Sequence, residues 1–130
     1  MGSLIINFHH ANVTVPPAKE TAAKEFYGSL LGLREVPKPK SSRQSGAWYQ
    51  LGGVQLHLSL EERELNEAAS SHICLLVADL AQTRKHLEDA GVRIFPDDKP
   101  VPGWPRFYIR DPGGNRIEIA QDVTSTQLAE

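Results

Sequence analysis

The sequence contains little of what would tie the protein to a membrane, an oxidising compartment or a nucleic acid. It has a single cysteine, Cys74, so no disulfide can form within the chain. No apolar run approaches the length of a transmembrane helix, and residues 1–7 lack the basic and long apolar regions of a secretory signal. A formal charge of -2 provides no basic field for nucleic acid. We therefore expect a cytoplasmic protein that has neither a membrane nor a nucleic-acid partner.

What is present is the composition of an ordinary globular protein. Of the 130 residues, 40% are hydrophobic and 23% are charged. This length suits one hydrophobic core and is short for two independent domains. We expect one domain over 1–130, with a first module at about 5–60, a second at about 71–121 and a polar tail at 122–130. Cys74 is interpreted as a small buried apolar residue.

The first half of the chain predicts one helix and four strands. The dipeptide Pro16-Pro17 ends the first strand, and Gly32 ends the helix. The pair Gly52-Gly53 favours a tight hairpin because glycine accepts positive φ without steric cost. The elements expected are strands at 5–15, 33–36, 47–51 and 54–60 and a helix at 21–31.

The second half repeats this order. Asp79, with Gln82 three residues later, is typical of a helix start, and Gly91 ends the helix. The elements expected are strands at 72–77, 92–95, 106–110 and 116–120 and a helix at 80–90. Two polar or proline-rich loops, 37–46 and 96–105, separate the strands in corresponding places.

An internal repeat connects the two halves. HANVTV at 10–15 is similar to HICLLV at 72–77, and GGVQLHL at 52–58 is similar to GGNRIEI at 113–119. Each half is a βαβββ unit of about 60 residues, which is small for burying a sheet alone. We predict an α+β fold in which two βαβββ modules in tandem form a curved mixed-sheet cup with helices on its outer face.

Alternation along the strands assigns a role to each sheet face. Apolar residues such as Val13 and Leu56 would pack beneath the helices, while the opposite face carries polar and aromatic side chains. Hairpin register would place Trp48 opposite His57 and Tyr108 opposite Glu118. Such a face is typical of a binding cup for a small molecule. The expected substrate-binding residues are Trp48, Gln55, Arg106 and Tyr108.

Four residues at equivalent places in the two modules predict a metal site. They are His10, His57, His72 and Glu118. Imidazole nitrogen and carboxylate oxygen suit one divalent transition metal, namely Fe, Ni, Zn, Co or Mn. Taken singly, each strand histidine is also explained as a hydrogen-bonded structural residue. His9 would point away if His10 points inward, and His86 lies on the second helix, where it would be solvated.

Several segments resemble the glyoxalase, bleomycin-resistance and dioxygenase superfamily, also called vicinal oxygen chelate proteins. These segments are HANVTVP at 10–16, FYGSLLGL at 26–33, VQLHL at 54–58 and FYIRDPGGNRIEI at 107–119. The resemblance implies paired βαβββ modules and a metal that two adjacent substrate oxygens chelate. It also implies a homodimer in which each cup combines the first module of one chain with the second module of its partner.

The family is functionally broad, so three activities stay open. The first is a metal-dependent lyase or isomerase in which Glu118 or a hydroxide on the metal moves the proton. Glyoxalase enzymes usually carry a carboxylate where this chain has His57, which departs from a strict lactoylglutathione lyase. The second is an Fe(II) extradiol-type dioxygenase with His10, His72 and Glu118 as ligands and His57 as an acid-base residue. The third is a metal-free drug-binding resistance protein.

Overall fold

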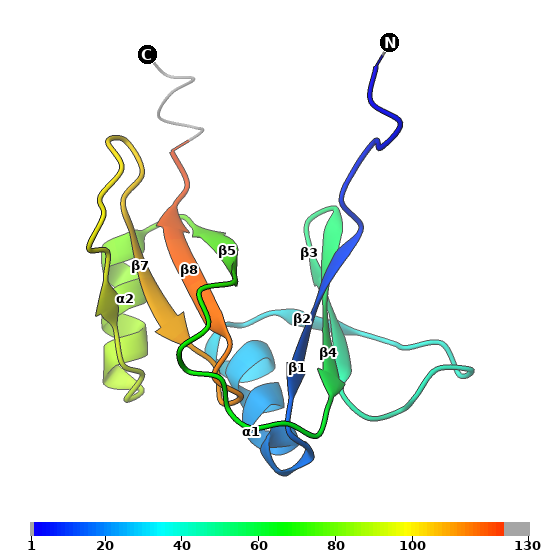
Figure 1. Cartoon of the computed structure of the whole chain (residues 1–130). Coiled ribbons are helices and arrows are strands. Elements are labelled where there is room, and N and C mark those ends of the chain that lie inside the picture. Colours follow the sequence, from blue (N-terminus) through cyan, green and yellow to red (C-terminus); the bar gives the residue numbers. More distant parts are fainter. Residues whose placement is uncertain (1, 124–130) are drawn as a thin grey trace. The chain divides into compact units, whose positions relative to one another are not determined.

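The protein is described by a computed structural model that covers residues 2–123. The chain divides into two compact units, Met1–Leu65 and Asn66–Glu130, and each contains one four-stranded sheet and one helical segment (Figure 1). Each unit has the strand-helix-strand-strand-strand order that the repeat predicts. The expectation of two βαβββ modules in tandem is therefore confirmed. Of the predicted polar tail, residues 124–130 lie outside the described residues.

The sheet of the first module is mixed. Strand β1 (His10–Val15) runs parallel to β4 (Val54–Leu60), and β4 runs antiparallel to β3 (Ala47–Leu51). Strand β2 (Arg34–Val36) completes the order β1-β4-β3-β2. The loop between β2 and β3 extends away from the sheet (Figure 1). Gly52 has a φ of 55° in the turn between β3 and β4, a conformation that glycine adopts without strain.

The helical segment of the first module is not one regular α-helix. After a 3-10 turn, η1 (Pro17–Lys19), the α-helix α1 (Glu20–Lys24) continues as a π-helical stretch, η2 (Glu25–Leu30). The amide of Leu31 donates to Phe26 O at 2.9 Å, which is the five-residue spacing of a π-helix. The side chains of Ala23, Phe26 and Tyr27 in this segment are buried, and the ring of Tyr27 lies 6.2 Å from that of Tyr49 on β3.

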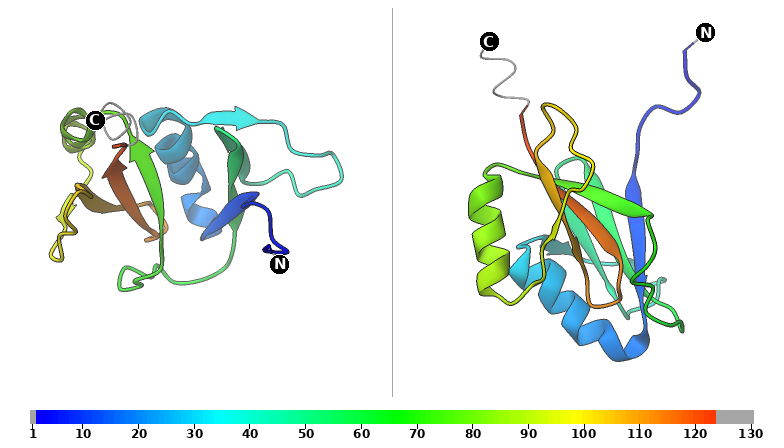
Figure 2. Two further views of the ribbon diagram at one scale, coloured as in Figure 1. Left: turned by 90° about the horizontal axis from the view of Figure 1, so that it is seen from above. Right: turned by 60° about the vertical axis from the view of Figure 1, so that its left-hand side comes forward.

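The second module has the same sheet pattern. Strand β5 (His72–Val77) runs parallel to β8 (Arg116–Gln121), which pairs with β7 (Arg106–Arg110). The two-residue strand β6 (Phe95–Pro96) gives the order β5-β8-β7-β6. Helix α2 (Leu80–Asp89) covers one face of this sheet (Figure 2).

Local hydrogen bonds explain the ends of these elements. The side chain of Asp79 accepts from the amide of Gln82 at 3.0 Å, which caps the first turn of α2 as predicted. In the turn between β7 and β8, the Asp111 carboxylate accepts from the amides of Gly113 and Asn115 at 2.8 and 2.9 Å. The DPGGN segment therefore closes the hairpin that carries Glu118.

Strand registers agree with the predicted faces. Trp48 pairs with His57, and Tyr108 pairs with Glu118. The buried apolar strand residues include Val13, Val15, Leu56, Leu58, Ile117 and Ile119. The polar residues of interest therefore lie on the opposite face of each sheet.

Two predicted strands differ from the structure by more than one residue. The first begins at His10 and not at residue 5, because its partner β4 starts at Val54, directly after the hairpin turn; His9 O still accepts from Gln55 N at 3.0 Å. The strand expected at 92–95 is only Phe95–Pro96, where Phe95 pairs with Tyr108. Proline lacks the amide that would extend the ladder.

Candidate functional site

The first module gathers a stack of aromatic rings around His57. The His57 side chain lies between Trp48 and His10, with ring centroids 4.1 Å from each and interplanar angles of 4° and 15°. The parallel register of β1 and β4 brings His10 beside the strand that carries His57. The structure therefore brings together two of the predicted metal ligands and one of the predicted substrate-binding residues.

A chain of glutamine amides orients the His57 ring. Gln50 Nε2 donates to the carbonyl oxygens of Gly52 and Val54 at 2.7 and 3.2 Å. Gln50 Oε1 then accepts from Gln55 Nε2 at 3.0 Å, which leaves Gln55 Oε1 to accept from His57 Nε2 at 2.8 Å. Since a carbonyl oxygen can only accept, the proton of His57 lies on Nε2 and the lone pair on Nδ1. Gln55, predicted to bind substrate, is committed here to His57.

The surroundings of His57 favour a neutral ring. Burial lowers its pKa, and the nearby charges of His10, His9 and Lys38 lower it further. His9 does not point away from His10, since their Nδ1 atoms lie 2.8 Å apart and their rings meet edge to face. A neutral imidazole with a free lone pair is the form that binds a transition metal.

The second module is organised around the carboxylate of Glu118, which is only 4% exposed. Its Oε2 accepts from Trp104 Nε1 at 2.8 Å and from the Cys74 thiol at 3.3 Å. Its Oε1 lies 3.4 Å from the Tyr108 hydroxyl, 3.5 Å from Arg106 Nη1 and 3.1 Å from His72 Nε2.

These donors keep Glu118 ionised. Burial alone raises the pKa of the carboxyl, but the hydrogen bonds from Trp104 and Cys74 and the charges of Arg106 and His72 outweigh it and lower the pKa. The same neighbourhood raises the pKa of the Cys74 thiol to about 12, through burial and then through the bond to Glu118. Cys74 is therefore a thiol that donates a hydrogen bond to Glu118 and is not a thiolate ligand.

The contact between His72 and Glu118 fits a bound cation. His72 Nδ1 lies 2.9 Å from Ser70 O, a carbonyl that can only accept, so Nδ1 carries a proton. The Nε2 lone pair of a neutral ring would then face the ionised Oε1 at 3.1 Å. Two acceptors at this distance need a proton or a metal ion between them. Two ligands about 2.1 Å from one ion lie about 3 Å apart at a right angle, so this donor pair suits a divalent metal.

The other predicted substrate-binding residues lie beside Glu118. Arg106 Nε donates to Asp97 Oδ2 at 2.8 Å, and this bond lowers the pKa of Asp97 and raises that of Arg106. The buried Tyr108 ring contacts the His72 ring edge to face, with centroids 5.7 Å apart. Burial and the Glu118 charge raise the pKa of the Tyr108 hydroxyl, which therefore remains protonated near neutral pH.

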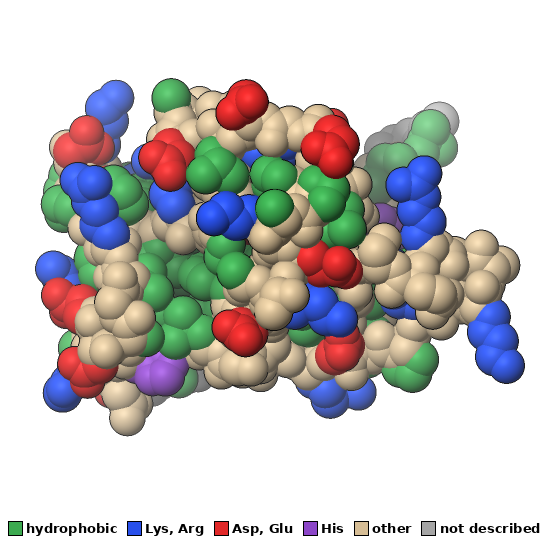
Figure 3. All heavy atoms as spheres, turned by 90° about the horizontal axis from the view of Figure 1, so that it is seen from below, with side chains coloured by type: hydrophobic (Ala, Val, Ile, Leu, Met, Phe, Trp, Pro, Cys, Tyr) green, Lys and Arg blue, Asp and Glu red, His purple; other side chains and the backbone are tan. Residues whose placement is uncertain are grey.

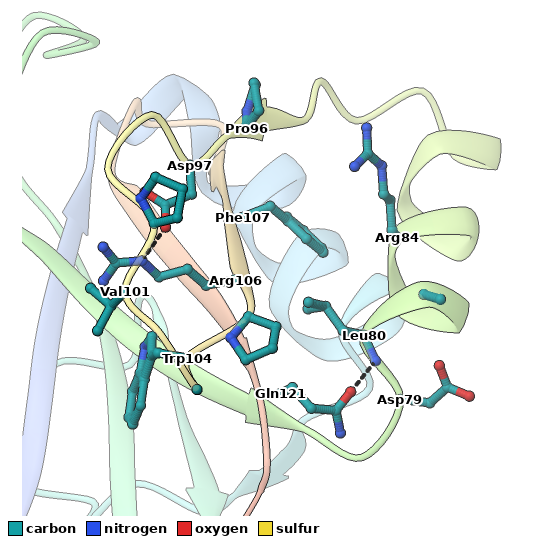
Figure 4. A pocket seen from close by; sticks show the side chains of 14 residues that line it. Asp79, Leu80, Arg84, Pro96, Asp97, Val101, Trp104, Arg106, Phe107 and Gln121 are labelled. Atoms are coloured by element: carbon teal, nitrogen blue, oxygen red, sulfur yellow. Dashed lines mark hydrogen bonds and ion pairs between the residues drawn. The ribbon is translucent and has the colours of Figure 1, made fainter.

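A hollow of about 690 Å³ opens next to these residues (Figure 4). Its wall is mostly apolar and is built by the loop from Pro96 to Pro105, the start of α2 and strand β7. Trp104 lies between this hollow and Glu118 and contacts both. Trp104 was not predicted, because its place between glycine and proline in the loop 96–105 belongs to no strand or helix pattern.

Cys74 and His86 are both exposed in the structure. Cys74, expected to be buried, is exposed because it lies on the polar face of the edge strand β5, and its thiol is only partly desolvated. His86 is exposed on α2, as predicted. Within neither module, over residues 2–123, do three or more His, Cys, Asp or Glu side chains gather in a group that could hold a metal ion. Of the four predicted ligands, His10 and His57 lie in the first module, and His72 and Glu118 lie in the second.

Surface charge is dispersed. On the face in Figure 3, Lys and Arg side chains alternate with Asp and Glu, and no patch of one sign gathers there. None of the helices within residues 2–123 is both long and apolar enough to cross a bilayer.

Comparison with known proteins gives a family match over most of the chain. The sequence model described as the glyoxalase/bleomycin resistance protein/dioxygenase superfamily matches residues 7–119. A crystal structure described as a glyoxalase family protein from Bacillus anthracis is 31% identical, with a TM-score of 0.83. That match covers 94% of this chain and 99% of the other. No curated protein matches at a significant level.

Two more distant structures share the fold. Lactoylglutathione lyase from Agrobacterium tumefaciens is 19% identical with a TM-score of 0.70, covering 92% of this chain and 96% of the other. The fosfomycin resistance protein FosX from Mesorhizobium loti is 18% identical with a TM-score of 0.68, covering 98% and 100%. At these identities the likeness concerns the fold alone.

Proposed function

Because the chain belongs to the glyoxalase/bleomycin resistance protein/dioxygenase superfamily, we propose that it is a metal-dependent enzyme acting on a small molecule with two adjacent oxygens. The reaction is a lyase or isomerase reaction that moves a proton on the substrate. The observation that carries the proposal is the pairing of His72 Nε2 with the ionised Glu118 Oε1 at 3.1 Å, a nitrogen and oxygen pair that either a proton or a metal ion can bridge. The proposal includes a cytoplasmic location, which rests on the sequence alone.

The proposed ligands are His10, His57, His72 and Glu118. His72 and Glu118 are a nitrogen and oxygen pair that suits Fe, Ni, Zn, Co or Mn. A divalent metal held by these residues would polarise the two substrate oxygens as a Lewis acid. The neutral His57 ring, oriented by Gln55, supports its assignment as a ligand or as the nearest neighbour of one.

In this proposal Glu118 is the base. Its lowered pKa keeps the carboxylate able to accept a proton at neutral pH. Oε2 is held by Trp104 and Cys74, so Oε1 is the oxygen that would take the proton from the substrate, and Glu118 would have to move off the metal to do so. Arg106 and Tyr108 would donate to the substrate's oxygens, since both side chains already lie within 3.5 Å of Oε1.

An Fe(II) extradiol-type dioxygenase is the second candidate. His10, His72 and Glu118 would then be the two-histidine, one-carboxylate ligand set. One observation favours it: His57 Nε2 is occupied by Gln55, which suits an acid-base role beside His10 better than ligation through that nitrogen. A metal-free drug-binding protein is the third outcome, in which the hollow beside Trp104 would take an apolar ligand.

Reconstitution separates these candidates. Protein stripped of metal is loaded with Ni, Co, Zn, Mn or Fe(II). It is then assayed without oxygen on a hemithioacetal and on a carboxylic acid that can epimerise at C2. A second assay, with oxygen, uses catechols. Turnover with Ni, Co or Zn in the absence of oxygen supports the lyase or isomerase. If oxygen is taken up, and only with Fe(II), the lyase or isomerase assignment is wrong and the dioxygenase takes its place. Failure to retain any of these metals would favour the drug-binding protein.

The proposal also includes a homodimer whose sites combine the first module of one chain with the second module of the partner. The family resemblance is the source of this part. It predicts that neither module holds the metal alone.

A further inference from the structure

Two arginines face each other across the hairpin of the second module. Arg110 on β7 and Arg116 on β8 are direct cross-strand partners, on the same sheet face as Glu118. Like charges directly opposite each other destabilise a sheet. Over residues 2–123 neither arginine forms a salt bridge, whereas Arg106, four residues before Arg110 on β7, contacts both Asp97 and Glu118.

Neutral groups hold both guanidinium groups in place. Arg116 stacks 3.8 Å from the centroid of the Tyr108 ring, and its Nη1 donates to Ser70 O at 3.2 Å. Nη1 of Arg110 donates to Gly114 O at 3.0 Å and more weakly to Asn66 O at 3.5 Å. Each guanidinium has five N–H donors, and in the described part of the chain Nε and Nη2 of both arginines have no hydrogen-bond acceptor.

The guanidinium nitrogens without a protein acceptor are not fully buried, so they are accessible to a ligand. Burial lowers the pKa of Arg110, the charge of Arg116 lowers it further, and the charge of Glu67 raises it only in part. Both side chains line a hollow of about 380 Å³, with the ring of Tyr108, Phe95 and Ser70 forming other walls. Asp98 also borders this hollow, yet it makes no ion pair with either arginine in the described residues.

From this arrangement we propose that Arg110 and Arg116 form an oxyanion-binding subsite that receives a carboxylate or phosphate group of the substrate. A planar guanidinium presents two parallel N–H donors, which match the two oxygens of such a group. The subsite adjoins the metal ligands, because His72 and Arg116 donate to the same carbonyl, Ser70 O. This inference rests on the proposed function, which says that the protein has a substrate. It narrows that substrate to a molecule with an oxyacid anion.

Anion binding to metal-free protein tests the subsite independently of the metal. Inorganic phosphate and malonate are titrated by calorimetry at constant ionic strength set with chloride. The wild type is expected to bind one of them at one site per chain. Arg116→Gln should weaken this binding at least about tenfold, the loss expected for one charge-assisted hydrogen bond. Arg116→Lys keeps the charge but loses the two parallel N–H donors of the guanidinium. Its affinity for the anion should lie between those of the wild type and Arg116→Gln.

The control is Arg34→Gln, which removes an exposed arginine of the first module and should leave anion binding unchanged. The tighter of the two probes identifies the phosphate or the carboxylate class. Should Arg116→Gln unfold by circular dichroism, Arg116→Lys and Arg110→Gln decide. The proposal is overturned if neither probe binds the wild type, or if folded variants at both arginines bind as the wild type does. Metal content measured on the same preparations reports separately on the proposed function.

Discussion

The Glu118 carboxylate is buried, yet its pKa lies below the ordinary value because donors surround both of its oxygens. A buried carboxylate with incomplete partners would gain a proton, and then it could neither hold a metal nor act as a base. Trp104 and Cys74 satisfy one oxygen and leave the other to His72 and Arg106. The chemistry proposed for this site therefore depends on a division of roles between the two oxygens: Oε2 accepts hydrogen bonds, and Oε1 stays available for the metal or the substrate.

Trp104→Phe tests this division. The variant keeps an aromatic ring in the loop but removes the indole N–H that donates to Glu118 Oε2 at 2.8 Å. Metal-free protein should lose about 1 kcal/mol of unfolding free energy, since a hydrogen bond to a charged group contributes about 1.5–3 kcal/mol and Trp104 is partly exposed. Urea denaturation measures the change. Trp48→Phe, which removes no bond to a carboxylate, is the control, and equal losses in both variants would contradict the role given to Trp104.

Alkaline stability depends in part on Tyr49. Burial, and then the charge of Glu35, raises the pKa of its hydroxyl above 10.0 in the folded state. The stability this provides is complete below pH 10.0 and is lost as the pH rises through the folded-state value. Tyr49→Phe should therefore weaken the fall in unfolding free energy above pH 10.0, and Tyr108 accounts for part of what remains. Urea unfolding on both sides of that pH checks it; identical slopes in both proteins would refute it.

Several of these residues could be predicted from the sequence. Alternation along β4, β5 and β8 was enough to place His57, His72 and Glu118 on one type of face, because every second side chain in a strand points the same way. Trp104 could not be found this way since it lies in a loop with no period. The partners of Gln55 and Cys74 were also beyond the pattern, because a side-chain bond depends on rotamers and not on register.

At the scale of the elements, hairpins were predicted more accurately than the helical segment. The bounds of β3, β4, β5 and β7 agree with the expected ranges, since glycine turns and prolines mark strand ends locally. The π-helical stretch η2 was not predicted. Apolar residues three and four apart occur in both helix types, so their spacing cannot distinguish the two.

Two glycines in the first module should respond oppositely to alanine. A Cβ at Gly28, in η2, would meet Tyr49 at an ordinary contact distance of 3.6 Å, so Gly28→Ala should raise the unfolding free energy by about 0.5–1 kcal/mol. Gly46 has a φ of 75°, and its Cβ would strike the carbonyl of Leu58. Gly46→Ala should cost about 2 kcal/mol or more. Urea denaturation measures both, and a stabilised Gly46→Ala would contradict the backbone geometry.

At the scale of the whole molecule, duplication explains why each module holds half of the proposed ligands. His10 in the first copy corresponds to His72 in the second, and His57 corresponds to Glu118. The family match over residues 7–119 spans both copies. A site assembled from two copies of one unit needs only two ligands from each.

A mixing experiment tests whether partner chains share sites. His10→Ala and Glu118→Ala chains are each expected to lose the metal as homodimers. In a dimer with shared sites, random mixing during refolding makes mixed dimers in which one of two sites is intact, so about a quarter of all sites should regain metal. The separately refolded variants, combined after refolding, are the control. A mixture that holds no more metal than its components would exclude shared sites.

The measurement that tests the central claim most directly is the metal content of the purified protein. Elemental analysis after reconstitution and desalting should find about one equivalent of a divalent transition metal per wild-type chain. His72→Ala and Glu118→Gln should each lose most of it, while His86→Ala, on the exposed face of α2, should keep it. A wild type that retains no metal, or variants at His72 and Glu118 that retain as much as the wild type, would contradict the account.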